Sequence, residues 1–310
     1  MRLDFVACRD GLRLAVRRWG NWSGHSIPLL CLPGLSRNGA DFDSLAAAVA
    51  PRPIVALDLL GRGMADRVDD PRRYAPGALV SDIRDVTAAL GLHHCVLIGT
   101  SFGGLLAMAL AVSQPGLPAA AILNDIGPGI AAAGGTSAGA SIWLEVVGNP
   151  PAPADWGEAV AYLQAVMPDL SIETPHGWQQ LAEATFAGSG NGGLKAQWDP
   201  AIVSPLKGDA ERPDIWAMFR ALASHPILAV RGGASLVLTA EGLAQMQDAA
   251  PAMRSVTLPG IGHAPTLTEP AALSAIRLFL GEIDRLHTER RDAYPFSKRR
   301  DRARIGTFRN

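Results

Sequence analysis

Continuous apolar runs recur along the chain, and stretches with helical composition separate most of them. The runs are bounded by Gly, Pro, Asp or Asn, which is typical of strands covered on both faces of a parallel sheet. They are Pro28–Leu32, Ile54–Leu57, Cys95–Ile98, Ala120–Leu123 and Ile227–Val230. The helical stretches are Asp43–Ala50, Leu79–Leu90 and Phe102–Ser113. Strands that alternate with helices predict an α/β fold with right-handed crossovers.

The two ends of the chain follow other patterns. Leu12–Trp19 alternates apolar and polar residues, and it follows a short strand at Asp4–Ala7. This pair predicts an antiparallel edge. Ser255–Leu258 is the predicted last strand, and Ala271–Leu286 is the predicted closing helix with Pro270 at its start.

A long insertion separates the strands Ala120–Leu123 and Ile227–Val230. It spans about a hundred residues, far more than one crossover helix needs. Helices are predicted in it at Ile142–Val147, Trp156–Val166 and Pro175–Phe186, and we interpret it as a helical cap over the carboxyl ends of the strands. The predicted domains are a core of residues 1–126 and 223–286, a cap of residues 127–222 and a basic tail of residues 287–310.

Composition narrows the class of protein. Of 310 residues, 48% are hydrophobic and 18% charged, which argues against disorder. The 28 basic and 29 acidic residues nearly cancel, so the main body lacks the charge of a nucleic-acid-binding protein. From Thr288 to Asn310, eight basic residues outnumber three acidic ones. We interpret this end as solvated, and a phosphate- or partner-binding arm is the alternative.

Cysteine usage and hydropathy indicate a compartment. The chain has three cysteines without metal-pair spacing, and Cys31 and Cys95 fall in apolar runs as core residues. No run reaches the 18 or so apolar residues of a membrane span, and the start lacks an apolar signal segment. We therefore expect a cytoplasmic protein with no membrane partner, and the oligomeric state stays open.

A candidate nucleophile stands in the segment Gly99-Thr-Ser-Phe-Gly-Gly104. It follows a predicted strand and opens a predicted helix, which is the setting of a Gly-x-Ser-x-Gly nucleophile elbow. Ser101 would stand at the top of the sheet, beside a helix N-terminus. A phosphate-binding Gly-rich turn is the alternative, but the residues of a P-loop and the spacing of a dinucleotide fingerprint are missing.

With this motif and four further segments, the sequence up to about Leu286 resembles the α/β-hydrolase superfamily, in its serine-nucleophile esterase- and lactonase-like branch. The segments are Leu32-Pro-Gly-Leu35, Asp58-Leu-Leu-Gly-Arg-Gly63, Asn124-Asp-Ile-Gly-Pro128 and Gly260-Ile-Gly-His-Ala-Pro265. The first resembles the oxyanion segment of the family, with Pro33 in place of His. The resemblance implies a mostly parallel eight-stranded sheet flanked by helices, with a helical cap inserted after the sixth strand.

The resemblance also implies the partners of Ser101. A serine hydroxyl needs a neighbouring base, and imidazole has a suitable pKa. Of seven histidines, only His263 lies in a glycine-rich loop just after the last strand, so we predict it as the general base. The backbone N–H groups of Phe102 and, by resemblance, Leu35 would form the oxyanion hole.

The third member of the triad departs from the common pattern. Many relatives carry an Asp after the seventh strand, where this chain has Leu236. Asp125 follows the sixth strand, where haloalkane-dehalogenase-like relatives carry their acid, and we predict it as the triad acid. In the alternatives Asp125 only caps a turn, Glu241 is the acid, or no functional acid exists. Asp58 is interpreted as holding its own turn.

The predicted function is hydrolysis of an ester-like bond, a carboxylic ester or a lactone, of a small and largely apolar substrate. An acyl-enzyme would form on Ser101, with no metal or organic cofactor. Arg37, Asn38 and Trp143 are candidate substrate contacts. An acyltransferase or a C–C bond hydrolase would use the same triad, and the residue at Leu236 leaves a weakened, ligand-binding protein as a further alternative.

Overall fold

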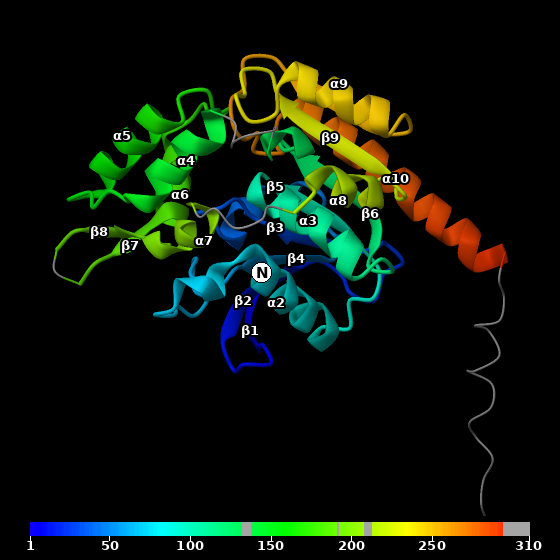
Figure 1. Cartoon of the computed structure of the whole chain (residues 1–310), viewed down its shortest axis with the longest axis horizontal. Helices are drawn as coiled ribbons and strands as arrows, with labels where there is room; N and C mark the ends of the chain where they lie inside the picture. The colour runs from blue at the N-terminus through cyan, green and yellow to red at the C-terminus, as the bar shows by residue number, and fades with distance from the viewer. Residues whose placement is uncertain (132–137, 191, 208–212, 294–310) are drawn as a thin grey trace, which may run out of the picture.

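An eight-stranded sheet forms the centre of the molecule (Figure 1). The computed structural model describes residues 1–131, 138–190, 192–207 and 213–293. In spatial order the strands are β1 (Arg2–Ala7), β2 (Arg13–Trp19), β4 (Ile54–Asp58), β3 (Leu29–Leu32), β5 (Cys95–Thr100), β6 (Pro118–Asn124), β9 (Ile227–Gly232) and β10 (Arg254–Leu258). β1 and β2 pair antiparallel at one edge, and the strands from β4 to β10 are parallel. The predicted sheet and its antiparallel edge are confirmed.

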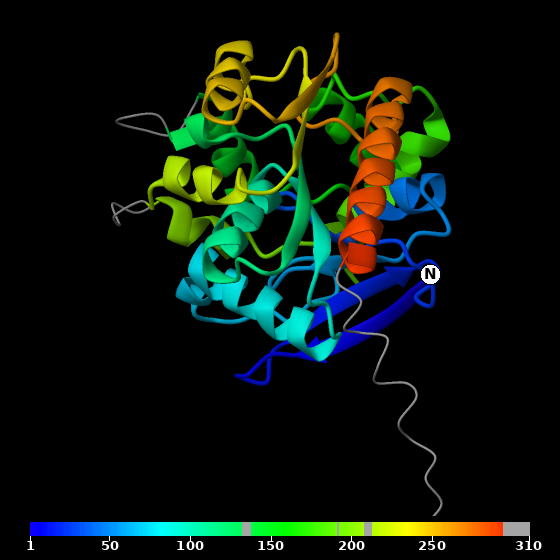
Figure 2. The ribbon, with the colours of Figure 1, turned by 90° about the vertical axis from the view of Figure 1, so that its right-hand side faces the viewer.

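Helices cover both faces of this sheet, as Figure 2 shows. The helices on one face are α2 (Pro76–Ala89), α3 (Phe102–Ser113) and α8 (Ile215–Leu222), whereas α1 (Asp43–Ala48) and α10 (Pro270–Ala293) cover the other. Successive strand residues enter opposite layers, so Leu97 packs on the α3 side and Ile98 on the α10 side. A strand buried on both faces must be apolar at every position, which explains the continuous runs.

The cap elements stand between β6 and β9 in the sequence and group together on one side of the sheet in Figure 1. They are η3 (Pro128–Ala131), α4 (Ala138–Gly148), α5 (Trp156–Val166), α6 (Pro175–Thr185), β7 (Phe186–Gly188), β8 (Leu194–Ala196), η4 (Pro200–Val203) and α7 (Ser204–Lys207). The three predicted cap helices are present. The antiparallel β7–β8 pair was not predicted, because its strands are three residues long and glycines stand around them.

Two helices, α8 and α10, do not fit the domain limits predicted from the sequence. α8 falls inside residues 127–222, yet it packs against α3 in the core. α10 continues past the predicted end at Leu286 to Ala293, and α9 (Ala240–Ala249) joins the α3-side core. The remainder of the basic tail, residues 294–310, and residues 132–137 lie outside the described part of the chain. The domain limits themselves stay predictions.

Cys31 and Cys95 are buried in the core, as predicted, and Cys8 is buried as well. The described cysteines are free thiols. Among the residues that the structure describes, no helix combines the length and the apolar character needed to cross a membrane.

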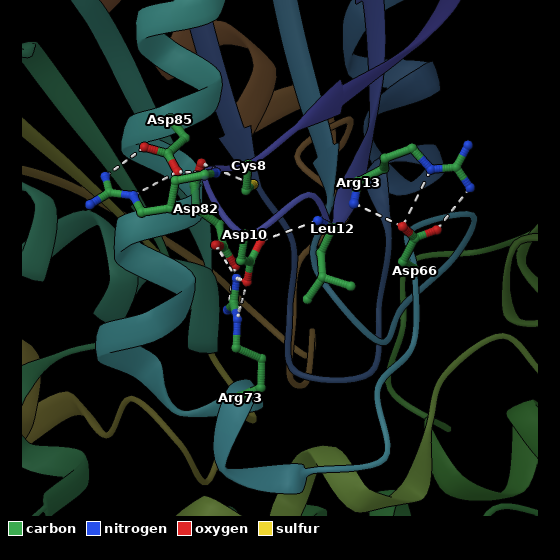
Figure 3. Close-up of polar contacts among 9 residues, drawn as sticks. Cys8, Asp10, Leu12, Arg13, Asp66, Arg73, Asp82 and Asp85 are labelled. Atoms are coloured by element: carbon green, nitrogen blue, oxygen red, sulfur yellow. Dashed lines mark hydrogen bonds and ion pairs between the residues drawn. The ribbon is translucent and has the colours of Figure 1, made fainter.

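Ion pairs fasten the β1–β2 turn to the neighbouring helix (Figure 3). Arg73, from η2 (Pro71–Tyr74), donates to both carboxylate oxygens of Asp82 on α2 at 2.6 and 2.9 Å, and it also pairs with Asp10 in the turn. Asp82 is only 2% exposed. Arg9 forms a similar pair with Asp85, but its side chain is largely solvated. The attachment of the β1–β2 turn to α2 therefore depends mainly on Arg73.

Replacing Arg73 by methionine should lower the free energy of unfolding by about 2–3 kcal/mol, since it leaves the buried Asp82 carboxylate without its cation. Urea denaturation monitored by circular dichroism measures this loss. The matched change Arg9→Met removes a solvated pair and should cost at most about 1 kcal/mol. Equal losses in the two variants would show that burial of Asp82 does not set the value of this pair.

Candidate active site

Ser101 stands at a strained turn between β5 and α3. Its backbone has φ 52° and ψ −118°, a conformation that a non-glycine residue keeps only when its surroundings enforce it. The enforcing contacts are close. A Cβ at Gly99 would lie 2.5 Å from Gly104 Cα, and one at Gly103 would lie 2.1 Å from the carbonyl oxygen of Leu32. Glycines at these places let strand, turn and helix pack together and raise Ser101 above the sheet.

His263 connects Ser101 with Asp125. Its Nε2 lies 2.8 Å from Ser101 Oγ, and its Nδ1 lies 2.7 Å from Asp125 Oδ2. The Asp125 side chain is fully buried, and that of His263 is 12% exposed. An ionised carboxylate only accepts hydrogen bonds, so Nδ1–H donates to Asp125 and Nε2 is left to accept the Ser101 proton. The arrangement can therefore withdraw a proton from the serine hydroxyl.

Asp125 reaches this place from the end of β6 and spans the gap to β9. Its backbone has φ 55°, and its N–H donates to the carbonyl of Val230 at 2.7 Å. Its Oδ1 accepts the N–H of Gly232, the last residue of β9, at 2.9 Å. The carboxylate thus lies beside the strand after which related chains carry their acid. Leu236 is 66% exposed in the following loop.

The other candidate acid lies apart from the histidine. Glu241 is exposed on the first turn of α9, where its carboxylate accepts a long 3.4 Å hydrogen bond from Gln245. Asp58 also differs from a free catalytic carboxylate. It is buried, and its two oxygens accept the N–H groups of Gly39 and Met64. Burial raises the pKa of Asp58, and its contacts agree with the interpretation that it holds its turn.

Asn124 holds the histidine loop and was given no role of its own by the sequence. Its Nδ2 donates to the carbonyl of Pro265 at 2.8 Å and to Thr100 Oγ1 at 3.1 Å. One side chain thereby joins the ends of β5 and β6 to the loop that carries His263. A polar residue at the carboxyl end of a buried strand, next to Asp125, was the available signal.

The two backbone amides that the sequence predicts for an oxyanion hole belong to Phe102 and Leu35. Phe102 is the first residue of α3, where an N–H has no partner within its own helix. Leu35 follows Pro33 and Gly34 in the loop after β3. Neither amide donates to another group in the described segments of the protein. Both predicted donors therefore remain available to a ligand.

A cavity of about 620 Å³ is bounded by Ser101 and His263 on one side and by the cap on the other. Trp143 of α4 lies at its wall, with its ring centre 6.1 Å from that of His263. Further lining side chains are apolar (Val147, Met167, Leu170, Leu181), carry hydroxyls (Ser171, Thr266, Thr268) or are charged (Arg17, Asp41, Asp43, Glu173, Glu183). Among the cap tryptophans Trp143, Trp156, Trp178 and Trp198, all of them described, only Trp143 lines this cavity.

Arg37 and Asn38 also line the cavity, but protein groups occupy their polar atoms. The Arg37 guanidinium makes a bidentate pair with Asp41 and donates to Thr185. Asn38 donates to the carbonyl of Ala184 at 2.7 Å. Both side chains tie the loop after β3 to the end of α6. Across the described ranges, no three His, Cys, Asp or Glu side chains gather as a metal site.

Known proteins share this arrangement of sequence and fold. The model of the alpha/beta hydrolase family matches residues 29–276. A 3-hydroxybutyrate-oligomer hydrolase from Cupriavidus necator is 33% identical, covering 90% of this chain and 98% of its own. A 2-(acetamidomethylene)succinate hydrolase from Mesorhizobium japonicum is 25% identical, with 81% and 87% covered. The crystal structure of an alpha/beta hydrolase from Novosphingobium aromaticivorans superposes with a TM-score of 0.81 at 36% identity, covering 90% of this chain and 98% of that one.

Proposed function

The chain belongs to the alpha/beta hydrolase family and is a hydrolase, and on that premise we propose that it cleaves carboxylic esters through an acyl-enzyme on Ser101. The observation that carries the proposal is the hydrogen-bonded series from Asp125 through His263 to Ser101 beside the cavity. A serine with such partners is an activated nucleophile. Relatives that open epoxides or remove halides place Asp at the elbow, so the serine favours ester chemistry.

The proposed reaction has two halves. His263 Nε2 accepts the Ser101 proton while Oγ attacks the ester carbonyl carbon, and the N–H groups of Leu35 and Phe102 stabilise the resulting oxyanion. His263 then returns the proton to the departing alcohol oxygen, which leaves an acyl group on Ser101. Water, deprotonated by the same imidazole, attacks this acyl-enzyme and releases the acid. Asp125 keeps Nδ1 protonated and stabilises the imidazolium formed in each half.

We propose short linear esters of hydroxy acids as the substrate class. The relative from Cupriavidus necator, which this chain matches along almost its whole length, is named for 3-hydroxybutyrate oligomers. The cavity has the size of small-molecule sites, and the apolar and hydroxyl-bearing side chains among its lining residues suit a short aliphatic chain that repeats ester oxygens.

The substrate test compares a linear 3-hydroxybutyrate dimer with β-butyrolactone. The dimer should be hydrolysed with a kcat/KM at least about tenfold higher, because only the linear ester can extend along the cavity. Titration of released acid measures both rates, and Ser101→Ala provides the blank. Faster opening of the lactone would reject the linear-ester assignment. Product esters that form at the expense of acid when an alcohol is added would instead indicate an acyltransferase.

The nucleophile is tested without any knowledge of the substrate. A fluorophosphonate probe should label the wild-type protein, and peptide mass spectrometry should place the adduct on Ser101. The His263→Ala variant should not react, because its serine stays protonated. A wild-type protein that remains unlabelled would refute the proposed function.

A further inference from the structure

Arg62 lies against both residues whose amides form the proposed oxyanion hole. Its Nε donates to the carbonyl oxygen of Leu35 at 2.8 Å, and its Cζ lies 5.7 Å from the centre of the Phe102 ring. We infer that Arg62 is the positioning residue of the oxyanion hole, holding Leu35 and Phe102 in place while its charge favours the oxyanion. The inference rests on the proposed function.

The guanidinium of Arg62 carries a buried charge that no carboxylate neutralises. The residue has no exposed surface, its Nη1 donates to the carbonyl of Leu60 at 2.7 Å, and its Nη2 is buried without a hydrogen-bond partner among the described residues. Among the residues that the structure describes, no ion pair includes Arg62. Burial lowers the pKa of Arg62 to about 9, against the weaker influence of Tyr74 and Asp199.

Such an arrangement opposes stability, because a cation transferred from water into the protein interior loses its hydration without a compensating partner. A neutral side chain of similar length would pack in the same space at no electrostatic cost. Native proteins keep violations of this kind chiefly where function needs them. The position beside Leu35 and Phe102 identifies the function concerned.

The turn around Arg62 is fixed from two directions. Within the core, the Asp58 carboxylate accepts the N–H of Met64, in the turn itself, and the N–H of Gly39, in the loop after β3. From the cap, the carbonyl of Gln197 accepts the Gly63 N–H at 2.7 Å, and the N–H of Asp199 donates to the carbonyl of Gly61 at 2.8 Å. The guanidinium is therefore held by its own backbone and can act as a brace.

The brace has a physical reason in the loop after β3. Pro33 stands where the resemblance places a histidine, so this loop lacks one hydrogen-bonding side chain. Arg62, from the turn after β4, supplies a hydrogen bond to the Leu35 carbonyl. A fixed positive charge in the protein interior also attracts negative charge that develops nearby more strongly than it would in water.

The test uses Arg62→Met, which keeps the length of the side chain and removes its charge, and Arg62→Lys, which keeps the charge and removes the planar fork. With p-nitrophenyl butyrate as the probe, Arg62→Met should lower kcat by about 10- to 100-fold and leave KM within about twofold. The affinity for an alkylboronic acid, which forms a tetrahedral anion on serine, should fall by the same factor. Arg62→Lys should recover part of kcat.

Stability separates this role from a structural one. Arg62→Met should melt close to the wild type, because the removal of an unpaired buried charge offsets the loss of the hydrogen bonds to the Leu35 and Leu60 carbonyls. The control variant Arg18→Met removes another arginine that lies over an aromatic ring, with its Cζ 4.6 Å from the centre of the Trp22 ring. Arg18 does not line the cavity. Its kcat should stay at the wild-type value.

Two results would overturn the inference. One is an Arg62→Met variant with kcat and boronate affinity within twofold of the wild type. The other is a loss of activity that appears only together with a lower melting temperature in both Arg62 variants. The fluorophosphonate reaction keeps the two proposals distinguishable: with either of these results, a wild type that labels at Ser101 removes the role of Arg62 and leaves the proposed function standing.

Discussion

Alanine at Ser101 is expected to lower kcat for a linear ester by about a million-fold while the protein stays folded. The change removes the oxygen proposed to hold the acyl group, which among the described residues is the hydroxyl that lies 2.8 Å from His263 Nε2. His263→Ala should produce a loss of similar size, since an unactivated hydroxyl is a poor nucleophile at neutral pH. Progress curves at saturating substrate, followed for hours, measure these residual rates.

The double variant carries the sharper information. Because Ser101 and His263 act as one unit, the two losses should not multiply, and the double variant should retain the residual rate of either single variant. Ser113→Ala is the matched control, because this serine ends the helix that Ser101 begins and is exposed. If Ser101→Ala kept a substantial fraction of wild-type kcat, the acyl-enzyme would not form at this residue.

Asparagine at Asp125 is expected to lower kcat by about 10⁴-fold. An amide that donates toward Nδ1 favours the tautomer whose Nε2 carries the proton, and that nitrogen can no longer accept the Ser101 proton. The fold should persist, because the asparagine Oδ1 can still accept the Gly232 N–H. Steady-state kinetics together with urea denaturation separate the two effects.

Glu241→Gln is the control for this change, since it neutralises the other acid that the sequence offered. It should leave kcat unchanged, because Glu241 is exposed and contacts Gln245 rather than His263. A loss confined to Glu241→Gln would make Glu241 the triad acid. Wild-type rates in both variants would indicate a Ser101–His263 pair that works without a carboxylate.

Local patterns were enough to predict most of the elements, Ser101 and His263, whereas Asp125 was predicted from the resemblance to the family. A strand covered on both faces must be apolar at every position, so β5 was found from Cys95–Ile98 alone, although it runs on to Thr100. Ser101 could be predicted because the elbow requires glycines within a few residues of it. His263 was isolated by its glycine-rich loop after the last strand.

Short elements, and elements with a weak hydrophobic pattern, could not be predicted or placed from the sequence. The strands β7 and β8 are too short for an alternating pattern to emerge, and glycines flank them. The helix α8 lies within the range interpreted as the cap, but its apolar face packs on α3. The sequence of residues 215–222 predicts an apolar helix face but not the surface on which it packs, because the cap and the core both present apolar residues.

The sequence by itself determined the order of strands and helices along the chain and predicted the nucleophile and its base, since each depends on the burial or backbone geometry of neighbouring residues. The tertiary structure decided which carboxylate faces His263, because Asp125 meets it across 138 positions of the chain. It also placed Asn124 against the histidine loop and Arg62 against Leu35 and Phe102. Parallel strands end at one edge of the sheet, and the distances between groups gathered there are set by packing, which the sequence pattern does not encode.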